Sequence, residues 1–436
     1  MKRWIPFWKD SVMPLIYDIA ATGAVLLGSP YLFWRSMRYP EEMRERFAGC
    51  SKEGLDPPVW WHASSVGELE ALRPILRETW NKAQGGKRPL LTLLTPTGRA
   101  RALQLWGDRI DIRMVPLDWF PVVRRHFNQV RPKSLILIET EIWPAMISAA
   151  HKREIPVAVV NGRLSRRNID KYRSMGWFFS PLFKRLRCVA ARSPEDAELF
   201  RLMGVSAERI CVAGNTKYEM PERPPSDPSW LEVRDWNAIL VLGSLRSEEK
   251  ETIKELLIHL KKKLPESQRV LVILAPRHPE RAPLFANLAG DAGWIVERRS
   301  EVKQKVRPAE NGAKILLLDT IGELSDLWWI AAAGLVGGTF APLGGHNLFE
   351  PASRGCPTFF GPSTDTVADV AAVLGETGGG RSVSSGTALG EEFLELLKKD
   401  DLRRETAQRA GLAAQKLAGG VLKTLDWLDR WGVMTS

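Results

Sequence analysis

Gly337-Gly338-Thr339-Phe340-Ala341-Pro342-Leu343-Gly344-Gly345-His346-Asn347-Leu348-Phe349-Glu350-Pro351 follows the apolar run 331–336 and predicts a strand that ends in an anion-binding loop. The two glycine pairs would let backbone N–H groups approach a phosphate closely. A helix expected to begin near Asn347 would add the partial positive charge of its N-terminus. Glu350 is placed to accept hydrogen bonds from ribose hydroxyls. The alternative is a glycine-rich turn capped by Asn347, but two glycine pairs with His346, Asn347 and Glu350 favour a nucleotide site.

The composition describes a globular chain of more than one domain. Its 436 residues exceed one ordinary core, and 44% hydrophobic with 26% charged residues excludes a disordered protein. The net charge of +11 suits nucleic acid, membrane phospholipid or a phosphorylated substrate, without choosing among them. The four cysteines have neither metal-ligand spacing nor a redox pair, which is typical of reduced cytosolic thiols: Cys50, Cys188, Cys211 and Cys356.

The N-terminal segment 1–48 has the features of a membrane anchor. Residues 12–34 are mostly apolar and reach the roughly 20 residues that a bilayer requires, although Pro14 and Asp18 interrupt the run. Trp4 and Trp8 precede the run and Trp34 ends it, where interfacial anchors would lie. Four basic residues follow it: Arg35, Arg38, Arg44 and Arg46. We expect an embedded or surface-lying anchor with the rest of the chain in the cytoplasm. A buried core helix is the alternative.

Apolar runs then alternate with helical patterns, which predicts an α/β fold with parallel sheets flanked by helices. The expected strands are 59–63, 90–95, 111–115, 134–138, 156–160, 189–191 and 210–212, followed by 238–242, 270–275, 294–296, 314–318 and 332–336. Proline-rich residues within 221–230 predict a linker between domains 49–220 and 231–390. We expect the helical segment 391–436 to pack back on the first domain. Ligands of such sheets bind beyond the carboxyl ends of the strands.

Glu68 is the candidate proton acceptor of the first domain. It follows the first predicted strand in the sequence Ser64-Ser65-Val66-Gly67-Glu68. A carboxylate there could take a proton from an alcohol, and the helix dipole would keep it ionised. Ser65 and Glu68 also have the spacing of a helix capping box, and on the residues alone this structural interpretation is favoured.

Two further motifs follow strands of the first domain. Glu139 and Glu141 come directly after the strand 134–138 and would point to the same side if that strand stayed extended, before Trp143-Pro144 starts a helix. The alternative is a strand end that becomes polar at the solvent. Arg163, Arg166 and Arg167 follow the next strand and could bind phosphate, or form a solvated helix start.

The second domain places cationic groups at strand ends. Gly243-Ser244 ends one predicted strand, and Arg277-His278 follows another. Lys217, just before the linker, could reach the cleft from the hinge, or simply lie in a turn. The chain contains no Asp-x-Asp, so we expect no metal site and cations that stabilise a leaving phosphate instead.

Six segments in this order resemble the 3-deoxy-D-manno-octulosonic acid (Kdo) transferases of lipopolysaccharide synthesis. They are Trp61-His62-Ala63-Ser64-Ser65-Val66-Gly67-Glu68, Glu139-Thr140-Glu141-Ile142-Trp143-Pro144, Asn161-Gly162-Arg163-Leu164-Ser165, Gly214-Asn215-Thr216-Lys217-Tyr218, Ala275-Pro276-Arg277-His278-Pro279-Glu280-Arg281 and Gly344-Gly345-His346-Asn347-Leu348-Phe349-Glu350-Pro351. Two loops depart from the family pattern. Leu245-Arg246 stands where Thr-His usually follows Gly-Ser, and Gly361-Pro362-Ser363-Thr364-Asp365 lacks an aromatic-Asn continuation.

The resemblance implies an inverting glycosyltransferase of the GT-B fold, with two Rossmann-like domains facing a cleft. It implies a CMP-Kdo donor and a lipid A precursor as acceptor. From the N-terminal segment we expect a place on the cytoplasmic face of the inner membrane, and we expect neither a cofactor nor a nucleic-acid partner. Glu68 becomes the general base, which overturns the capping interpretation. The acceptor residues would be Ser65, Gly67, Glu139, Glu141 and Arg163. The donor residues would be Lys217, Gly243, Ser244, Arg277, His278, Gly344, Gly345, His346, Asn347 and Glu350.

Two other functions are compatible with the same fold. One is a non-catalytic binding protein of the membrane surface that retains the glycosyltransferase fold without its chemistry. The other is a soluble nucleotide-sugar epimerase, which would leave the apolar N-terminal segment without a purpose.

Overall fold

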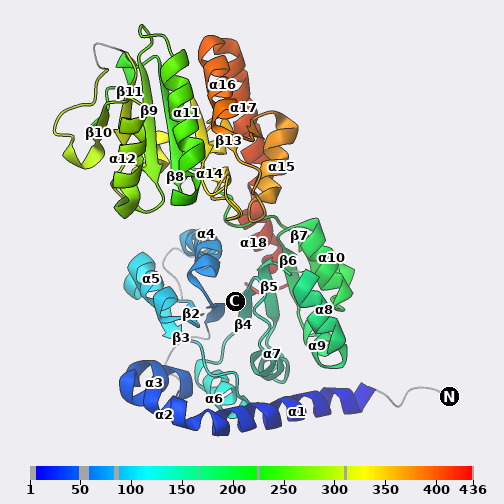
Figure 1. Cartoon of the computed structure of the whole chain (residues 1–436). Helices are drawn as coiled ribbons and strands as arrows, with labels where there is room; N and C mark the ends of the chain where they lie inside the picture. Colours follow the sequence, from blue (N-terminus) through cyan, green and yellow to red (C-terminus); the bar gives the residue numbers. More distant parts are fainter. Residues whose placement is uncertain are drawn as a thin grey trace. The chain divides into compact units, whose positions relative to one another are not determined.

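The computed structural model describes residues 6–48, 58–82, 88–164, 166–222, 226–308 and 312–434, and the chain divides into two compact units (Figure 1). Unit 1 comprises Met1–Glu219 with Gly419–Ser436, and unit 2 comprises Met220–Ala418. The chain therefore first passes from unit 1 to unit 2 beside the proline-rich stretch that predicts a linker.

Unit 1 is built on a sheet of seven parallel strands in the order β3-β2-β1-β4-β5-β6-β7. The strands are β1 (Val59–Ala63), β2 (Leu90–Leu93), β3 (Asp111–Met114), β4 (Ser134–Ile138), β5 (Val157–Gly162), β6 (Cys188–Ala191) and β7 (Ile210–Val212). Every residue of β4 and β5 is buried. Continuous burial of this kind is what a parallel sheet requires when helices cover both of its faces.

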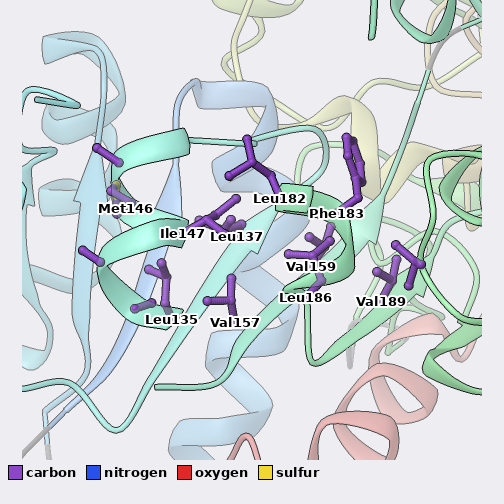
Figure 2. Packing of buried hydrophobic residues seen from close by; sticks show 14 of the residues in the cluster. Leu135, Leu137, Met146, Ile147, Val157, Val159, Leu182, Phe183, Leu186 and Val189 are labelled. Carbon is purple, nitrogen blue, oxygen red and sulfur yellow. The ribbon is translucent and has the colours of Figure 1, made fainter. Parts of the chain in front are cut away.

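Alternate side chains of these strands enter two separate cores. Leu135, Leu137, Val157 and Val159 pack with helices α7 and α9 (Figure 2). The neighbouring residues on each strand, such as Ile136 and Ile138, face the core formed with α4, α5 and α18. The helices of the unit are α4 (Val66–Lys82), α5 (Pro96–Trp106), α6 (Phe120–Val130), α7 (Pro144–His151), α8 (Arg166–Ser174), α9 (Gly176–Lys184), α10 (Pro194–Leu202) and α18 (Gly420–Arg430).

Unit 2 repeats this architecture with the parallel strand order β10-β11-β9-β8-β12-β13-β14. Its strands are β8 (Ala238–Leu245), β9 (Val270–Pro276), β10 (Val296–Arg298), β11 (Lys314–Leu317), β12 (Ala333–Val336), β13 (Thr358–Phe360) and β14 (Gly380–Ser382). Its helices are α11 (Lys250–Lys263), α12 (Ala282–Asp291), α13 (Leu324–Leu327), α14 (Phe349–Ala352), α15 (Ala368–Thr377), α16 (Gly386–Lys398) and α17 (Asp400–Leu417).

The prediction of two parallel α/β domains is confirmed, with local differences. All twelve predicted strands exist, but β10 begins only at Val296, because Trp294 is buried and its Nε1 donates to the Leu257 carbonyl at 3.0 Å. The short strands β13 and β14 are missing from the prediction. Their three residues each are too few to form a recognisable pattern.

The predicted packing of residues 391–436 on the first domain is wrong for most of that segment. Helices α16 and α17 belong to unit 2, where Leu389 and Phe393 of α16 enter the core beside α11. The segment leaves unit 2 at Gly419, whose φ of +88° is a left-handed conformation that suits glycine. Only α18 returns to unit 1, where it packs against α4.

The N-terminal segment forms the helices α1 (Pro6–Leu27), α2 (Ser29–Arg38) and α3 (Pro40–Ala48). Side-chain hydrogen bonds that involve two residues of helix α1 attach it to the rest of unit 1. The Tyr17 hydroxyl donates to Asp118 Oδ2 at 2.7 Å, and Trp119 Nε1 donates to Thr22 Oγ1 at 2.9 Å. Among the described residues no single helix has the length and apolarity to cross a bilayer. The bent pair Ile16–Leu27 and Ser29–Arg38, which meets at 62°, satisfies these criteria only when both parts are taken together.

Candidate active site

In each unit the motifs lie at the point in the parallel sheet where the strand order reverses, because the chain stops adding strands on one side and continues on the other. In unit 1 the chain moves outward from β1 to one edge and then resumes on the other side of β1 with β4. In unit 2 the corresponding neighbours are β8 and β12. Parallel α/β sheets bind ligands at the carboxyl ends of the strands beside such a reversal. The loops after β1 and β4, and those after β8 and β12, are therefore the candidate binding loops.

Glu68 is held at the start of α4 by hydrogen bonds within the loop that follows β1. Its Oε2 accepts the backbone N–H of Ser64 at 2.7 Å, and its Oε1 accepts the Ser65 hydroxyl at 3.1 Å. Ser65 Oγ also accepts the Glu68 N–H at 3.3 Å, which is one half of a capping box, but the Glu68 carboxylate accepts the N–H of Ser64 and not that of the cap residue Ser65. The capping role and a chemical role are therefore compatible, since the same hydrogen bonds orient the carboxylate.

The environment of Glu68 makes its carboxyl group more basic than the helix-dipole argument predicts. Burial, with the negative charges of Glu141 and Glu139, raises the pKa of Glu68 to about 7 against the opposing hydrogen bonds from Ser64 and Ser65. The expectation that the helix N-terminus keeps this group firmly ionised is therefore wrong, because desolvation has the larger effect. A pKa near neutrality is the range in which a general base is most effective.

Glu141 is the centre of a polar network that reaches Glu68 through Ser64. Its Oε2 accepts the Trp143 Nε1–H at 2.6 Å and the Ser64 hydroxyl, and it lies 3.4 Å from His62 Nε2. Although burial opposes it, these contacts hold the pKa of Glu141 below its usual value. The two carboxyl groups thus have different properties, with Glu141 anionic and Glu68 able to exchange a proton near pH 7.

His62 and Ser64 have no role in the sequence-based prediction, and Trp143 has only that of a bulky residue before a proline-started helix. His62 is fully buried, and its Nδ1 lies 3.1 Å from the carbonyl oxygen of Thr92. A polar residue inside the buried strand β1 was the one available signal that His62 has a partner, because an unpaired imidazole would be costly there.

Glu139 and Glu141 have different partners, because strand β4 does not stay extended through them. Strand β4 ends at Ile138, and Glu139 has φ +54°, a left-handed conformation that is uncommon for residues other than glycine. The turn directs Glu139 towards Lys217, whose Nζ lies 3.3 Å from Oε1. Lys217 is expected to contact the donor, but the structure places it in unit 1 and pairs it with this acid.

The third motif of unit 1, residues 161–165, forms hydrogen bonds at the same edge of the sheet. The Thr140 hydroxyl donates to the Arg163 carbonyl, and Asn161 Oδ1 accepts the Thr216 N–H at 3.1 Å. The Arg163 side chain is exposed, as a residue that meets a ligand must be. The side chains of Arg166 and Arg167 lie outside the described part.

The first glycine pair of the second-unit motif does not offer free amides to a phosphate. The buried carboxylate of Glu249 accepts the backbone N–H groups of Gly338 at 2.8 Å, Thr339 at 2.9 Å and Phe340 at 3.0 Å, and that of Arg246 at 3.0 Å. The prediction that this pair cradles an anion is therefore wrong: an internal carboxylate already occupies the cradle. The adjacent acids Glu248-Glu249 suggest only a helix start, so sequence reasoning missed this role.

The second glycine pair forms a left-handed turn. Gly344 and Gly345 have φ values of +81° and +87°, and a Cβ at position 344 would lie 2.6 Å from Thr366 Cγ2. The loop that departs from the family pattern supports this turn, since Ser363 Oγ accepts the Gly344 N–H at 3.1 Å. Glycine is required here by conformation and by space.

The helix expected near Asn347 is only the single turn α14, beginning at Phe349, whose N–H donates to Asn347 Oδ1 at 3.1 Å. One turn gives little dipole, so the macrodipole contribution in the prediction is too large. Glu350 lies in this turn with a third of its side chain exposed, 4.0 Å from Arg354.

The remaining donor candidates surround the carboxyl ends of β8 and β9. Gly243 leaves room for Trp328, since a Cβ would lie 2.5 Å from that ring. Ser244 does not end its strand as predicted: β8 continues to Leu245 through an irregular register, and Ser244 has φ +56°. Arg277 and His278 are exposed directly after β9.

His346 completes this group from the loop after β12. Burial, with the positive charges of Arg277 and Arg246, lowers the pKa of His346. Its Nε2 is buried and has no hydrogen-bond partner among the described residues. The same part of the chain contains no group of three or more His, Cys, Asp or Glu side chains arranged to hold a metal ion.

Comparison with known proteins agrees with this arrangement of motifs. Residues 41–220 match the family model of the 3-deoxy-D-manno-octulosonic-acid transferases (kdotransferases). The 3-deoxy-D-manno-octulosonic acid transferase of Bordetella pertussis is 31% identical over 95% of this chain and 99% of its own length. The chain belongs to the Kdo transferase family. The prediction made from the six motifs is thereby confirmed.

Other relatives are consistent with this membership. The enzyme of the same name from Aquifex aeolicus is 30% identical over 85% of this chain and 94% of its own. Among solved structures, a UDP-GlcNAc 2-epimerase from Neisseria meningitidis, bound to UDP-GlcNAc, superposes with a TM-score of 0.53 at 14% identity, covering 84% of this chain and 100% of that one. At this identity the likeness concerns the fold alone.

Proposed function

We propose that this Kdo transferase moves Kdo from CMP-Kdo to a hydroxyl of a lipid A precursor, with inversion at the anomeric carbon. The observation that carries the mechanism is the oriented carboxylate of Glu68, whose pKa of about 7 suits proton abstraction. Glu68 removes the proton of the acceptor hydroxyl as its oxygen attacks the anomeric carbon of Kdo. The bond from that carbon to the CMP phosphate oxygen breaks, and CMP leaves with the electron pair.

The loop after β1 and the loops after β4 and β5 form the acceptor side. Glu141 keeps its negative charge near Glu68 and so favours proton uptake by that group. Glu139, held by Lys217, and the exposed Arg163 are further acceptor contacts. Arginine suits the phosphate groups of such an acceptor, since its guanidinium binds phosphate in a fork.

The cationic loops of unit 2 form the donor side. Arg277, His278 and His346 supply positive or hydrogen-bonding groups to the leaving CMP, and Glu350 accepts ribose hydroxyls. Protein cations can stabilise a leaving phosphate by preorganised electrostatics. We accordingly expect turnover to persist in excess EDTA. Loss of activity that magnesium restores would contradict this part of the proposal.

We further propose that the N-terminal helices hold the enzyme on the cytoplasmic face of the inner membrane. Large apolar side chains of α1 and α2 are exposed, including Leu26, Leu27, Phe33, Trp34 and Met37. Of the basic residues that follow, Arg35 and Arg46 are paired with Glu42 at 2.8 and 2.9 Å, so lipid attraction would depend on the others. An amphipathic surface of this type lies in the interface without crossing the bilayer.

The test is a transfer assay with CMP-Kdo and a lipid A precursor, followed by mass spectrometry of the lipid. A mass increase by one or more Kdo units, abolished by Glu68→Gln, would support the proposal. CMP binding without any modified lipid would favour a non-catalytic binding protein. Conversion of a nucleotide sugar to its epimer without lipid would favour an epimerase.

A further inference from the structure

Arg246 occupies a central position in unit 2 that the donor residues named above do not include. It follows β8 directly and therefore lies beside the reversal between β8 and β12. Its side chain is largely buried, with 27% exposed. Its Nη1 lies 3.1 Å from His278 Nε2, which belongs to the loop after β9. The guanidinium, which can only donate, thus points towards the imidazole of that loop.

The carboxylates near Arg246 are either exposed or already engaged. Glu248 lies 3.6 Å from Arg246 Nη2 and Glu280 lies 3.7 Å from His278 Nδ1, and both of these carboxylates are exposed. The charge of Glu249 is already stabilised by four backbone N–H groups, including that of Arg246 itself. Arg277 forms no ion pair with any described residue. The guanidinium groups of Arg246 and Arg277 therefore have no buried ion-pair partner among the described residues.

A second observation indicates that a ligand belongs there. His346 Nε2 is buried and lacks a hydrogen-bond partner within the described part of the chain. Buried polar atoms are seldom left unpaired, because each costs the desolvation energy of the group. Burial, and then the positive charges of Arg277 and Arg246, lower the pKa of His346, so these two cations act on the same imidazole.

We propose that Arg246 is a donor-binding residue whose guanidinium contacts an oxyanion of the nucleotide sugar. This inference rests on the proposed function and adds Arg246 to the donor residues, in the loop 243–249 that departs from the family pattern. The oxyanion is the nucleotide phosphate or the carboxylate of the sugar, and both suit the planar fork of arginine. At this position arginine supplies a permanent positive charge and a planar guanidinium that can donate two parallel hydrogen bonds, which a histidine would not supply.

Calorimetry with CMP tests the inference, first on the wild-type chain and then on Arg246→Gln and Arg246→Lys. Loss of a hydrogen bond to a charged group corresponds to about 10- to 100-fold weaker binding. We expect this for Arg246→Gln, a smaller loss for Arg246→Lys, and no change in cytidine binding for either. Arg269→Gln is the matched control, because Arg269 is exposed at the opposite end of the same strand from Arg277 and should leave CMP affinity unchanged.

Kinetics with CMP-Kdo distinguish the two oxyanions. Weaker binding of CMP assigns Arg246 to the phosphate. Unchanged CMP affinity with a KM for CMP-Kdo raised about 10-fold or more assigns it to the sugar carboxylate. If CMP affinity and this KM both stay within about twofold of wild type in Arg246→Gln, the inference is overturned while the proposed function stands. A wild-type chain that neither binds CMP nor transfers Kdo would overturn both.

Discussion

The backbone N–H of Ser64 lies 2.7 Å from Glu68 Oε2, while the hydroxyl of the same serine donates to Glu141. Ser64 thus orients two carboxyl groups whose pKa values are shifted in opposite directions. Glu68 follows β1 and Glu141 follows β4, the two strands between which the strand order reverses. Neither shift needs a metal ion: burial raises the pKa of Glu68, and hydrogen bonds overcome burial at Glu141. When two nearby acids have different environments, one can serve as the proton acceptor while the other stays negatively charged.

Glu68→Gln should lower turnover by roughly 100-fold or more, the usual scale for loss of a positioned general base. The glutamine retains an oxygen that can accept the Ser64 N–H, so the cap and the fold should be preserved. Steady-state kinetics and calorimetry with CMP measure the two effects separately, and CMP affinity should not change. Glu70→Gln is the matched control two residues along the same helix, where Glu70 only pairs at the surface with Arg73 and Arg101.

The capping interpretation makes a different demand, which Glu68→Ala tests because alanine removes the acceptor of the Ser64 N–H. Loss of a cap costs about 1 kcal/mol of stability and leaves chemistry intact. Near-normal turnover of Glu68→Gln, together with a lowered free energy of unfolding of Glu68→Ala, would return Glu68 to a purely structural role.

The pH dependence of kcat/KM should report the raised pKa of Glu68. Below a pH of about 7 the base is protonated, so kcat/KM should fall by about tenfold per pH unit and level off above 7. Glu141→Gln removes a negative charge that raises this pKa, and should move the acid limb of the profile to lower pH. A limb that stays in place in Glu141→Gln would exclude Glu68 as the group that titrates.

The free energy of unfolding should depend on pH through the protonation of Glu68, and the direction of this dependence can be predicted. The folded chain holds it up to a pH of about 7, whereas the unfolded chain loses it near the ordinary value of 4.5. Since the folded state binds more protons in this interval, the free energy of unfolding of the wild type relative to Glu68→Gln should decrease from pH 4.5 to 7 and then stay constant. Urea titrations at several pH values would measure the difference.

Much of the fold could be predicted because parallel strands are buried along their whole length. Segments such as 135–138 and 270–275 are uninterrupted apolar runs, and their order along the chain alternates with helices. The glycines and acids after these runs mark the carboxyl ends of strands, where the site of a parallel sheet lies. Local patterns therefore suffice to locate the candidate loops.

What the sequence could not provide are contacts between distant residues. Glu249 and Gly338 are 89 positions apart, and only the adjacency of β8 and β12 brings the carboxylate to the glycine amides. The left-handed turn at Glu139 is likewise invisible in a pattern of alternating side chains, since the conformation is imposed by the surroundings. Desolvation of Glu68 depends on the same tertiary packing.

Glu249→Gln should destabilise unit 2 and weaken CMP binding together. The amide group of glutamine would meet backbone N–H donors where the carboxylate now accepts four of them, and buried donors left unpaired cost about 1–3 kcal/mol each. We expect a free energy of unfolding lower by about 2–4 kcal/mol. Glu248→Gln is the control at the adjacent, half-exposed position and should change stability by less than about 0.5 kcal/mol. Equal stabilities of the two variants would contradict the structural role of Glu249.

Tyr17→Phe should loosen α1 from unit 1. The hydroxyl of Tyr17 donates to the buried Asp118, which also accepts the N–H groups of Ala145 and Met146 at the start of α7. Its removal should cost about 1–3 kcal/mol and increase hydrogen exchange in residues 16–27. Tyr31→Phe is the control, because the Tyr31 hydroxyl only accepts an exposed hydrogen bond from Arg35. Unchanged exchange in Tyr17→Phe would mean that other contacts hold the helix.

Substitutions on the exposed side of α1 and α2 test the membrane proposal better than deletion of the segment. Deletion would also remove Tyr17 and Thr22 and so expose the surface that α1 covers. Leu27 and Phe33 are 86% and 66% exposed, so Leu27→Glu with Phe33→Glu should leave folding and CMP binding intact.

The measurement is co-flotation with vesicles that contain anionic lipid. Transfer of one large apolar side chain out of water is worth about 1.5–3 kcal/mol, so the double variant should bind vesicles at least about 10-fold more weakly. Leu422→Glu is the control, since Leu422 is 54% exposed on α18 of the same unit. Transfer to an acylated acceptor in vesicles should fall with binding, whereas transfer to a short, soluble acceptor should not. Equal flotation of both variants and the wild type would show that these helices do not hold the enzyme at the membrane.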